Sequence, residues 1–163
     1  MGKLLKLALC VSLLALPTGV MAQARTIDGT DPVQITNALQ EAGYKASPGK
    51  RDNGDPYIAS AANGSTFTIE FYGCEGEKAC SSLQFYAWYK KEPFFSETLV
   101  NDWNKQKRFL KAYIDNDGDL GTTMDVSTLG PMGAENFEDV IDWWTVMSAE
   151  LISFLKERRQ PAD

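Results

Sequence analysis

Three aspartates alternate within the segment Asp115-Asn116-Asp117-Gly118-Asp119, as the acidic side chains do at the start of a calcium-binding loop. An EF-hand loop also requires a glycine at its sixth position and a glutamate at its twelfth. Counted from Asp115, those positions hold Leu120 and Val126. The segment lies between two alternating apolar patterns, where Asp-Gly is typical of a hairpin turn. We therefore predict a turn and no metal site, with weak calcium binding as the alternative.

Groups that could carry acid–base or nucleophilic catalysis are scarce. The chain contains no histidine, which excludes a Ser-His-Asp triad and a Cys-His pair. Glu70 and Asp125 lie in strand-like segments and could form an acid–base pair. Each falls on the polar side of its pattern, which predicts a solvated position. We predict no catalytic residue and no cofactor; a small periplasmic enzyme or metal-binding protein that uses the acidic turn is the alternative.

The cysteines Cys74 and Cys80 are separated by five residues. In an oxidising compartment, an even pair at such short separation is typical of a disulfide. The spacing differs from the Cys-x-x-Cys of redox enzymes. Two thiolates without a histidine are also a poor zinc site. Because both cysteines lie at the turn between two predicted strands, we predict a structural disulfide that closes the end of a hairpin.

Several aromatic residues fall outside the apolar patterns. Strand alternation directs Tyr72, Tyr86 and Trp88 away from the apolar residues of their own strands. An exposed aromatic patch is typical of a partner or dimer surface, although a further helix could cover it. Trp143 could likewise be exposed or covered, because its neighbour Trp144 occupies the centre of a helical apolar stripe. These four residues form the predicted partner surface; a small-ligand carrier with an aromatic-lined cleft is the other interpretation.

Three segments carry helix signals. Asp31 is a good N-cap, Pro32 fits the first helical position and Gly43 is a natural stop. Ser96 can cap a second helix. Apolar residues at steps of three and four predict a third, amphipathic helix over 134–156.

Strand signals occupy much of the remaining sequence. The expected strands are 57–62, 65–72, 82–90, 108–114 and 120–126. Asn63-Gly64 is a strong hairpin signal between the first two. The segment 47–56, Ser-Pro-Gly-Lys-Arg-Asp-Asn-Gly-Asp-Pro, is dense in turn formers and predicts a surface loop. The order α-β-β-β-α-β-β-α predicts an α+β fold, an antiparallel sheet of about five strands with helices packed on one face.

The N-terminal segment 1–24 has the parts of a secretory signal peptide. Lys3 and Lys6 supply positive charge, an apolar run covers 7–16, and small residues precede cleavage near Ala22 or Ala24. The apolar run is shorter than the about 20 residues of a membrane helix, which favours cleavage over a retained anchor. We expect a single domain at 25–163 that is periplasmic or secreted and has no membrane anchor after cleavage.

The charge balance narrows the classes of partner. The formal net charge is −6, and removal of the leader would change it to −8, because the leader contains two lysines and no acidic residue. An acidic protein is poorly suited to bind nucleic acid or anionic lipid. We therefore expect no nucleic-acid partner, and the negative charge favours solubility.

The C-terminal half resembles the YbjN-type domain of bacteria over the run from Trp103 to Leu155. The shared pattern is a Trp-Asn pair, an Arg-Phe-x-x-Ala-Tyr-x-Asp strand, an Asp-Gly-Asp turn, a Met-Asp-Val strand and a Glu-Asn helix start. Its residues here are Trp103, Asn104, Arg108, Phe109, Ala112, Tyr113, Asp115, Gly118, Asp119, Met124, Asp125, Val126, Glu135 and Asn136.

The resemblance implies a fold similar to the chaperones of type III secretion, which bind other proteins, often as dimers, and carry no known catalytic residue. The family is labelled as sensory-transduction regulators. This sequence departs from cytoplasmic members through its leader and its cysteine pair. The leading hypothesis is an exported, non-catalytic YbjN-type module of the bacterial envelope, regulatory or chaperone-like, whose partner is another protein or a second copy of itself.

Overall fold

The computed structural model describes residues 25–159, and the expected signal peptide at 1–24 lies outside the described residues. The elements in chain order are β1 (Thr26–Ile27), α1 (Pro32–Glu41), β2 (Ala46–Lys50), β3 (Pro56–Ala62), β4 (Ser65–Tyr72), β5 (Ser82–Tyr89), α2 (Glu97–Gln106), β6 (Lys111–Ile114), β7 (Leu120–Ser127), β8 (Met132–Gly133) and α3 (Ala134–Arg158). None of the helices within 25–159 is long and apolar enough to span a bilayer.

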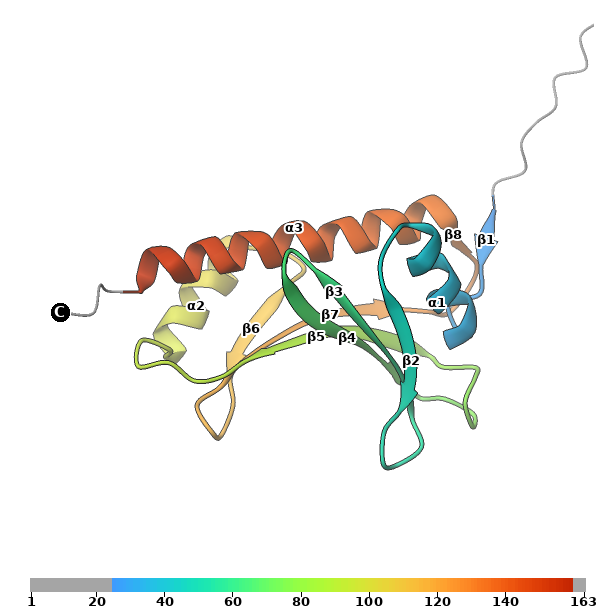
Figure 1. Cartoon of the computed structure of the whole chain (residues 1–163), viewed down its shortest axis with the longest axis horizontal. Helices are drawn as coiled ribbons and strands as arrows, with labels where there is room; N and C mark the ends of the chain where they lie inside the picture. Colours follow the sequence, from blue (N-terminus) through green and yellow to red (C-terminus); the bar gives the residue numbers. More distant parts are fainter. Residues whose placement is uncertain (1–24, 160–163) are drawn as a thin grey trace, which may run out of the picture.

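Six strands form one antiparallel sheet in the order β2-β3-β4-β5-β7-β6, and β1 pairs separately with β8. Figure 1 shows α3 running along one side of the sheet, with α1 and α2 near its two ends. The predicted α+β class, with helices on one face of an antiparallel sheet, is confirmed. The large sheet has one strand more than expected, because β2 was not predicted.

Segment 47–56 was predicted to be a surface loop, and this was wrong for its first half. Residues Ala46–Lys50 form the edge strand β2, and the turn is confined to 51–55. A proline is tolerated on an edge strand because its missing N–H can face outward. Gly49 leaves room for the ring of Tyr57, its partner on β3. Pairing with β3 thus overrides the local turn propensity.

The strand predicted from Arg108 begins only at Lys111. Phe109 has a φ of +63°, in the left-handed region, which interrupts an extended conformation. The other strand boundaries agree with the prediction within one residue, and the third helix ends two residues later, at Arg158. Asn63 and Gly64 both have positive φ, as expected for their two-residue hairpin turn.

The apolar core lies between the sheet and the helices. On β4, Phe67, Ile69 and Phe71 are buried while the residues between them are not, which confirms the period of two. Trp144 packs against the rings of Phe67 and Phe85, each with a centroid separation of 5.5 Å. The two predicted N-caps are present: the Asp31 carboxylate accepts the Val33 N–H at the start of α1, and the Ser96 hydroxyl accepts the Leu99 N–H at the start of α2.

Candidate functional site

The sheet side away from α3 is not covered by any element within 25–159 (Figure 1). We call it the open face. Strand alternation and register place on it the side chains of Tyr57, Ala59, Ala61, Thr66, Thr68, Glu70, Tyr72, Gln84, Tyr86, Trp88, Lys111, Tyr113, Thr123 and Asp125. The turns at 51–55 and 115–119 project on this side of the sheet (Figure 1). The open face is therefore bordered by turns and has no helical cover.

Three of the four residues predicted for a partner surface lie on the open face, spread along β4 and β5. Tyr86 and Trp88 are neighbours on one side of β5, and Tyr72 lies on the adjacent strand β4. Trp88 is 50% exposed and Tyr72 is 47% exposed, whereas Tyr86 is half-buried. Their exposure follows from the packing of the helices on one side of the sheet. The residues that alternate with them along the same strands point to the other side and fill the core.

Trp143, the fourth predicted residue, lies elsewhere. It is on α3, in the helical layer, and its ring stacks on that of Phe109 with a centroid separation of 4.1 Å. The guanidinium of Arg108 lies 4.7 Å from the centre of the Phe109 ring. Because α3 lies on the side of the sheet away from the open face (Figure 1), Trp143 is not part of the open face.

Two further tyrosines lie flat near the margins of the open face. The Tyr57 ring lies over Gly49 of β2, and the Tyr113 ring lies over Gly121 of β7. A Cβ atom at either glycine would overlap the ring, so the glycines are required for this close approach. Sequence reasoning missed both tyrosines, because the signal is a Tyr–Gly pair across two strands and depends on the register.

Polar residues on the open face are joined into pairs. The Arg51 Nε atom donates to Glu70 Oε2 at 2.9 Å, and the guanidinium lies 4.3 Å from the centre of the Tyr57 ring. The Gln84 side chain donates to Asp125 at 2.7 Å. Glu70 and Asp125, considered above as an acid–base pair, stand on either side of Gln84 in the register and each has its own partner. This arrangement positions both carboxylates as hydrogen-bond acceptors.

A hollow of about 610 Å³ occupies the part of the open face between β2 and β5. Small side chains form its floor, because β3 and β4 contribute Ala59, Ala61, Thr66 and Thr68. Larger side chains surround it: Tyr86 and Trp88 from β5, and Lys45, Arg51 and Tyr57 from the β2 side. The hollow exists because two neighbouring strands carry small residues beside a strand that carries two aromatic ones.

Burial and the neighbouring Tyr113 raise the pKa of Tyr86 to about 12. Burial is also the main cause that raises the pKa of Tyr72. The phenols are therefore neutral over the physiological pH range and keep a proton to donate. An aromatic surface of this kind offers apolar rings together with hydrogen-bonding hydroxyls.

The acidic turn is held by its own hydrogen bonds. Asp115 accepts the backbone N–H groups of Asp117 and Asp119, both at 2.9 Å. Asp119 accepts the Lys91 N–H at 2.7 Å and the Trp88 indole N–H at 2.9 Å. Within residues 25–159, no group of three or more His, Cys, Asp or Glu side chains is arranged to hold a metal ion. The predicted turn is confirmed, and its last aspartate positions the Trp88 ring.

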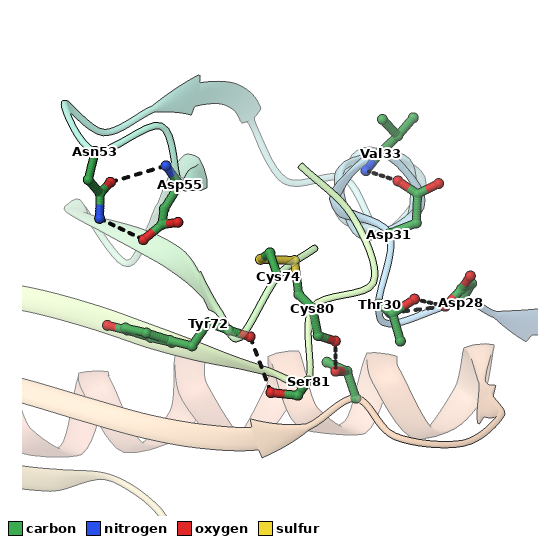
Figure 2. The surroundings of a disulfide bond; sticks show 11 residues. Asp28, Thr30, Asp31, Val33, Asn53, Asp55, Tyr72, Cys74, Cys80 and Ser81 are labelled. Atoms are coloured by element: carbon green, nitrogen blue, oxygen red, sulfur yellow. Dashed lines mark hydrogen bonds between the residues drawn. A yellow bond between two sulfur atoms is a disulfide. The ribbon is translucent and has the colours of Figure 1, made fainter. Parts of the chain in front are cut away.

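The predicted disulfide between Cys74 and Cys80 is present (Figure 2). Cys80 is fully buried; its N–H donates to the Thr30 carbonyl, and its carbonyl accepts the Thr128 hydroxyl at 2.5 Å. The disulfide therefore closes the β4–β5 connection where that connection meets the segments before α1 and after β7. Its location supports the structural role expected from the sequence.

A family model described as "Putative bacterial sensory transduction regulator" matches residues 31–157. The chain belongs to the YbjN family. No curated protein and no solved structure matches it. The match extends from α1 to α3, so the open face and the disulfide both lie within the YbjN domain.

The Trp-Asn pair noted in the sequence has a structural role in this YbjN domain. Asn104 on α2 donates to the Ala112 carbonyl at 2.9 Å and accepts the Ala112 N–H at 3.0 Å. The indole of Trp103 donates to the Leu110 carbonyl at 3.1 Å. The side chain of Asn104 thus satisfies backbone groups on the outer edge of β6 in place of another strand.

Proposed function

We propose that this YbjN protein is an exported, non-catalytic, protein-binding module of the bacterial envelope that contacts its partner through the open face. The observation that carries the proposal is the exposure of Tyr72 and Trp88 on the same uncovered sheet face as Tyr86. Tyrosine and tryptophan are enriched among the residues that contribute most to protein–protein binding. The family's description as a regulator is consistent with a binding role.

The aromatic residues are held in position before a partner arrives. The indole of Trp88 is fixed by its hydrogen bond to Asp119, and the rings of Tyr57 and Tyr113 lie against the backbone. A side chain that is already ordered loses less conformational entropy on binding, which favours affinity. The open face is therefore a preorganised surface.

Both edges of the large sheet are protected, which favours binding through the face over the addition of a partner strand. On the β6 edge, Asn104 occupies the N–H and carbonyl of Ala112. On the β2 edge, Pro48 has no N–H and the Gln40 side chain donates to the Ala46 carbonyl at 3.1 Å. Strand addition requires unpaired backbone groups along an edge.

Two observations support the export part of the proposal. The N-terminal segment has the composition of a cleaved leader. The disulfide between Cys74 and Cys80 is of a kind that persists in oxidising compartments. An exported regulator would act on envelope proteins rather than on DNA, in agreement with the net charge of −6.

The test is site-specific photo-crosslinking in intact cells of the source bacterium. A photoreactive residue replaces Trp88 in one strain and Leu129, which is 75% exposed outside the open face, in another. We expect position 88 to crosslink to a discrete protein and position 129 not to do so. The substitution Tyr72→Ser should weaken the crosslink from position 88. If position 88 yields no protein adduct, or both positions yield the same adducts, the open face is not the binding surface.

A small-ligand carrier is the second candidate, and the hollow of about 610 Å³ favours it. This volume lies within the range of about 300–1,000 Å³ typical of small-molecule sites. Native mass spectrometry of protein purified from its own envelope would detect a bound small molecule. A stoichiometric adduct that Trp88→Ser removes would favour the carrier over the protein-binding module.

A further inference from the structure

The charged residues that line the hollow are positive, whereas the net charge of the whole chain is negative. The charged residues that line it are Lys45 and Arg51, both basic, in a protein with a net charge of −6. Lys45 is exposed, and no ion pair found within 25–159 includes it. Arg51 donates two of its five N–H groups to Glu70, which leaves three for another acceptor. Both ends of the hollow therefore offer donors to an anionic group.

The two basic residues flank the strand that forms one side of the hollow. Lys45 directly precedes β2 and Arg51 directly follows it. Six residues of extended chain cover about 20 Å, since a strand rises about 3.3 Å per residue. A polypeptide segment of about seven residues, lying extended along β2, would place its first and last side chains near these two donors.

Apolar surface lies between the two basic ends. The methyl group of Ala59 forms the middle of the floor, and the Tyr86 ring stands at the opposite side, in register with Ala59 through Thr68. An apolar side chain near the middle of the segment would be buried between floor and ring, with a gain of about 25 cal/mol for each Å² of apolar area removed from water. The hollow thus combines a central apolar contact with a cation at each end.

We infer that the hollow binds an extended, acidic segment of a partner protein, in which carboxylates about six residues apart flank an apolar side chain. The inference rests on the proposed function and names the chemistry of the partner. The apolar side chain contacts Tyr86 and Ala59, one carboxylate pairs with Lys45, and the other accepts the free N–H groups of Arg51. Segments with basic ends are rejected by the same two residues.

The test uses three synthetic peptides that differ only in their first and last residues, which are Glu, Gln or Lys. Each peptide has about seven residues, leucine at its centre, Ser and Ala elsewhere, and ends blocked by acetyl and amide groups to remove terminal charge. Binding of a fluorophore-labelled peptide to the full protein is measured by anisotropy. We expect the Glu peptide to bind about fivefold more tightly than the Gln peptide, since each exposed ion pair contributes about 0.5 kcal/mol. The Lys peptide should bind most weakly.

Two matched charge reversals locate the effect. Lys45→Glu should abolish the preference for the Glu peptide, and Lys105→Glu should preserve it. Lys105 lies on α2, away from the open face, and does not line the hollow. Both lysines are exposed, so both variants should fold, which circular dichroism checks. A preference that survives Lys45→Glu would overturn the inference.

The remaining outcomes separate this inference from the proposed function. If the three peptides bind equally and Tyr86→Ser weakens all of them, the acidic specificity is wrong and the open face remains a binding surface. If no peptide binds while position 88 still crosslinks to a protein in cells, the partner is not an acidic segment. If Tyr86→Ser leaves the affinity of the Glu peptide unchanged, the hollow is not its site.

Discussion

At the scale of single residues, Tyr86 belongs to the open face but is partly removed from water. Its ring is half-buried beside Tyr113, and both desolvation and this neighbour raise its pKa to about 12. Ionisation of the phenol would place a negative charge where water is partly excluded, which costs free energy. The neutral phenol is therefore part of the folded state.

A dependence of stability on alkaline pH follows from this residue. The folded-state pKa lies above the ordinary value of 10, so the folded protein retains the proton more strongly than the unfolded chain. The contribution of Tyr86 to the free energy of unfolding is then complete below pH 10 and is lost as the pH rises from 10 to about 12. Urea unfolding at a series of pH values should show this decline.

The variant Tyr86→Phe tests whether Tyr86 causes this loss of stability at alkaline pH. It should reduce the slope of stability against pH in this window, but not abolish it, because the pKa values of Tyr72 and Tyr89 are also raised. The absorbance of tyrosinate, measured on the folded protein, should show one late-titrating group fewer. Identical pH profiles for the variant and the wild type would contradict the assignment.

At the scale of elements, the disulfide stabilises the connection between β4 and β5. Crosslinking Cys74 to Cys80 closes a short loop and reduces the entropy of the unfolded chain. The chain-entropy relation gives about 2 kcal/mol for a loop of this length. We expect reduction by a phosphine to lower the free energy of unfolding by about this amount, measured by urea denaturation.

The same experiment has an internal control. The variant with both Cys74→Ala and Cys80→Ala should start from a lower stability and show no further loss on reduction. Binding through the open face should persist in the reduced protein, because the disulfide lies beyond the end of the β4–β5 hairpin (Figure 2). A loss below about 1 kcal/mol would mean that contacts of Cys80 hold this connection without the covalent bond.

Prediction from the sequence succeeded for elements whose signals are local. The alternation in β4, the Asn-Gly turn and the caps Asp31 and Ser96 were all readable, because each depends on neighbours in the chain. β2 was missed because Pro48 and Gly49 favour a turn locally, and only pairing with β3 makes the segment a strand.

The same distinction applies to the open face. Alternation alone placed Tyr72, Tyr86 and Trp88 on one side of the sheet. The hollow could not be predicted, because it requires small residues on β3 and β4 to lie beside aromatic residues of β5, which the register decides. The stacking of Trp143 on Phe109 likewise depends on the left-handed backbone of Phe109.

At the scale of the whole molecule, the sheet is closed to other strands at both edges and open on one face. Unpaired edges are sites at which sheets pair with other chains and aggregate. Here the protection is built from single residues: Pro48 and Gln40 on the β2 edge, and Asn104 on the β6 edge. An exposed aromatic face is itself a site of association, and the protected edges remove a second one.

The protection of the β2 edge can be removed without touching the open face. Pro48→Val supplies an outward N–H on β2, and Gln40→Ala frees the Ala46 carbonyl. We expect the double variant to keep its fold and to self-associate as its concentration rises, because the edge can then pair with a second copy. Sedimentation velocity over a range of concentrations would detect larger species than the wild type forms.

Association through the edge must be separable from binding through the open face. Pro131→Val makes the same substitution at an exposed proline outside the large sheet and should leave the sedimentation profile unchanged. Adding Trp88→Ser to the edge variant should not reverse its association, since Trp88 points from the face of a central strand. If Trp88→Ser did reverse it, the copies would be joined through their open faces, and Pro48 and Gln40 would have no protective role at the edge.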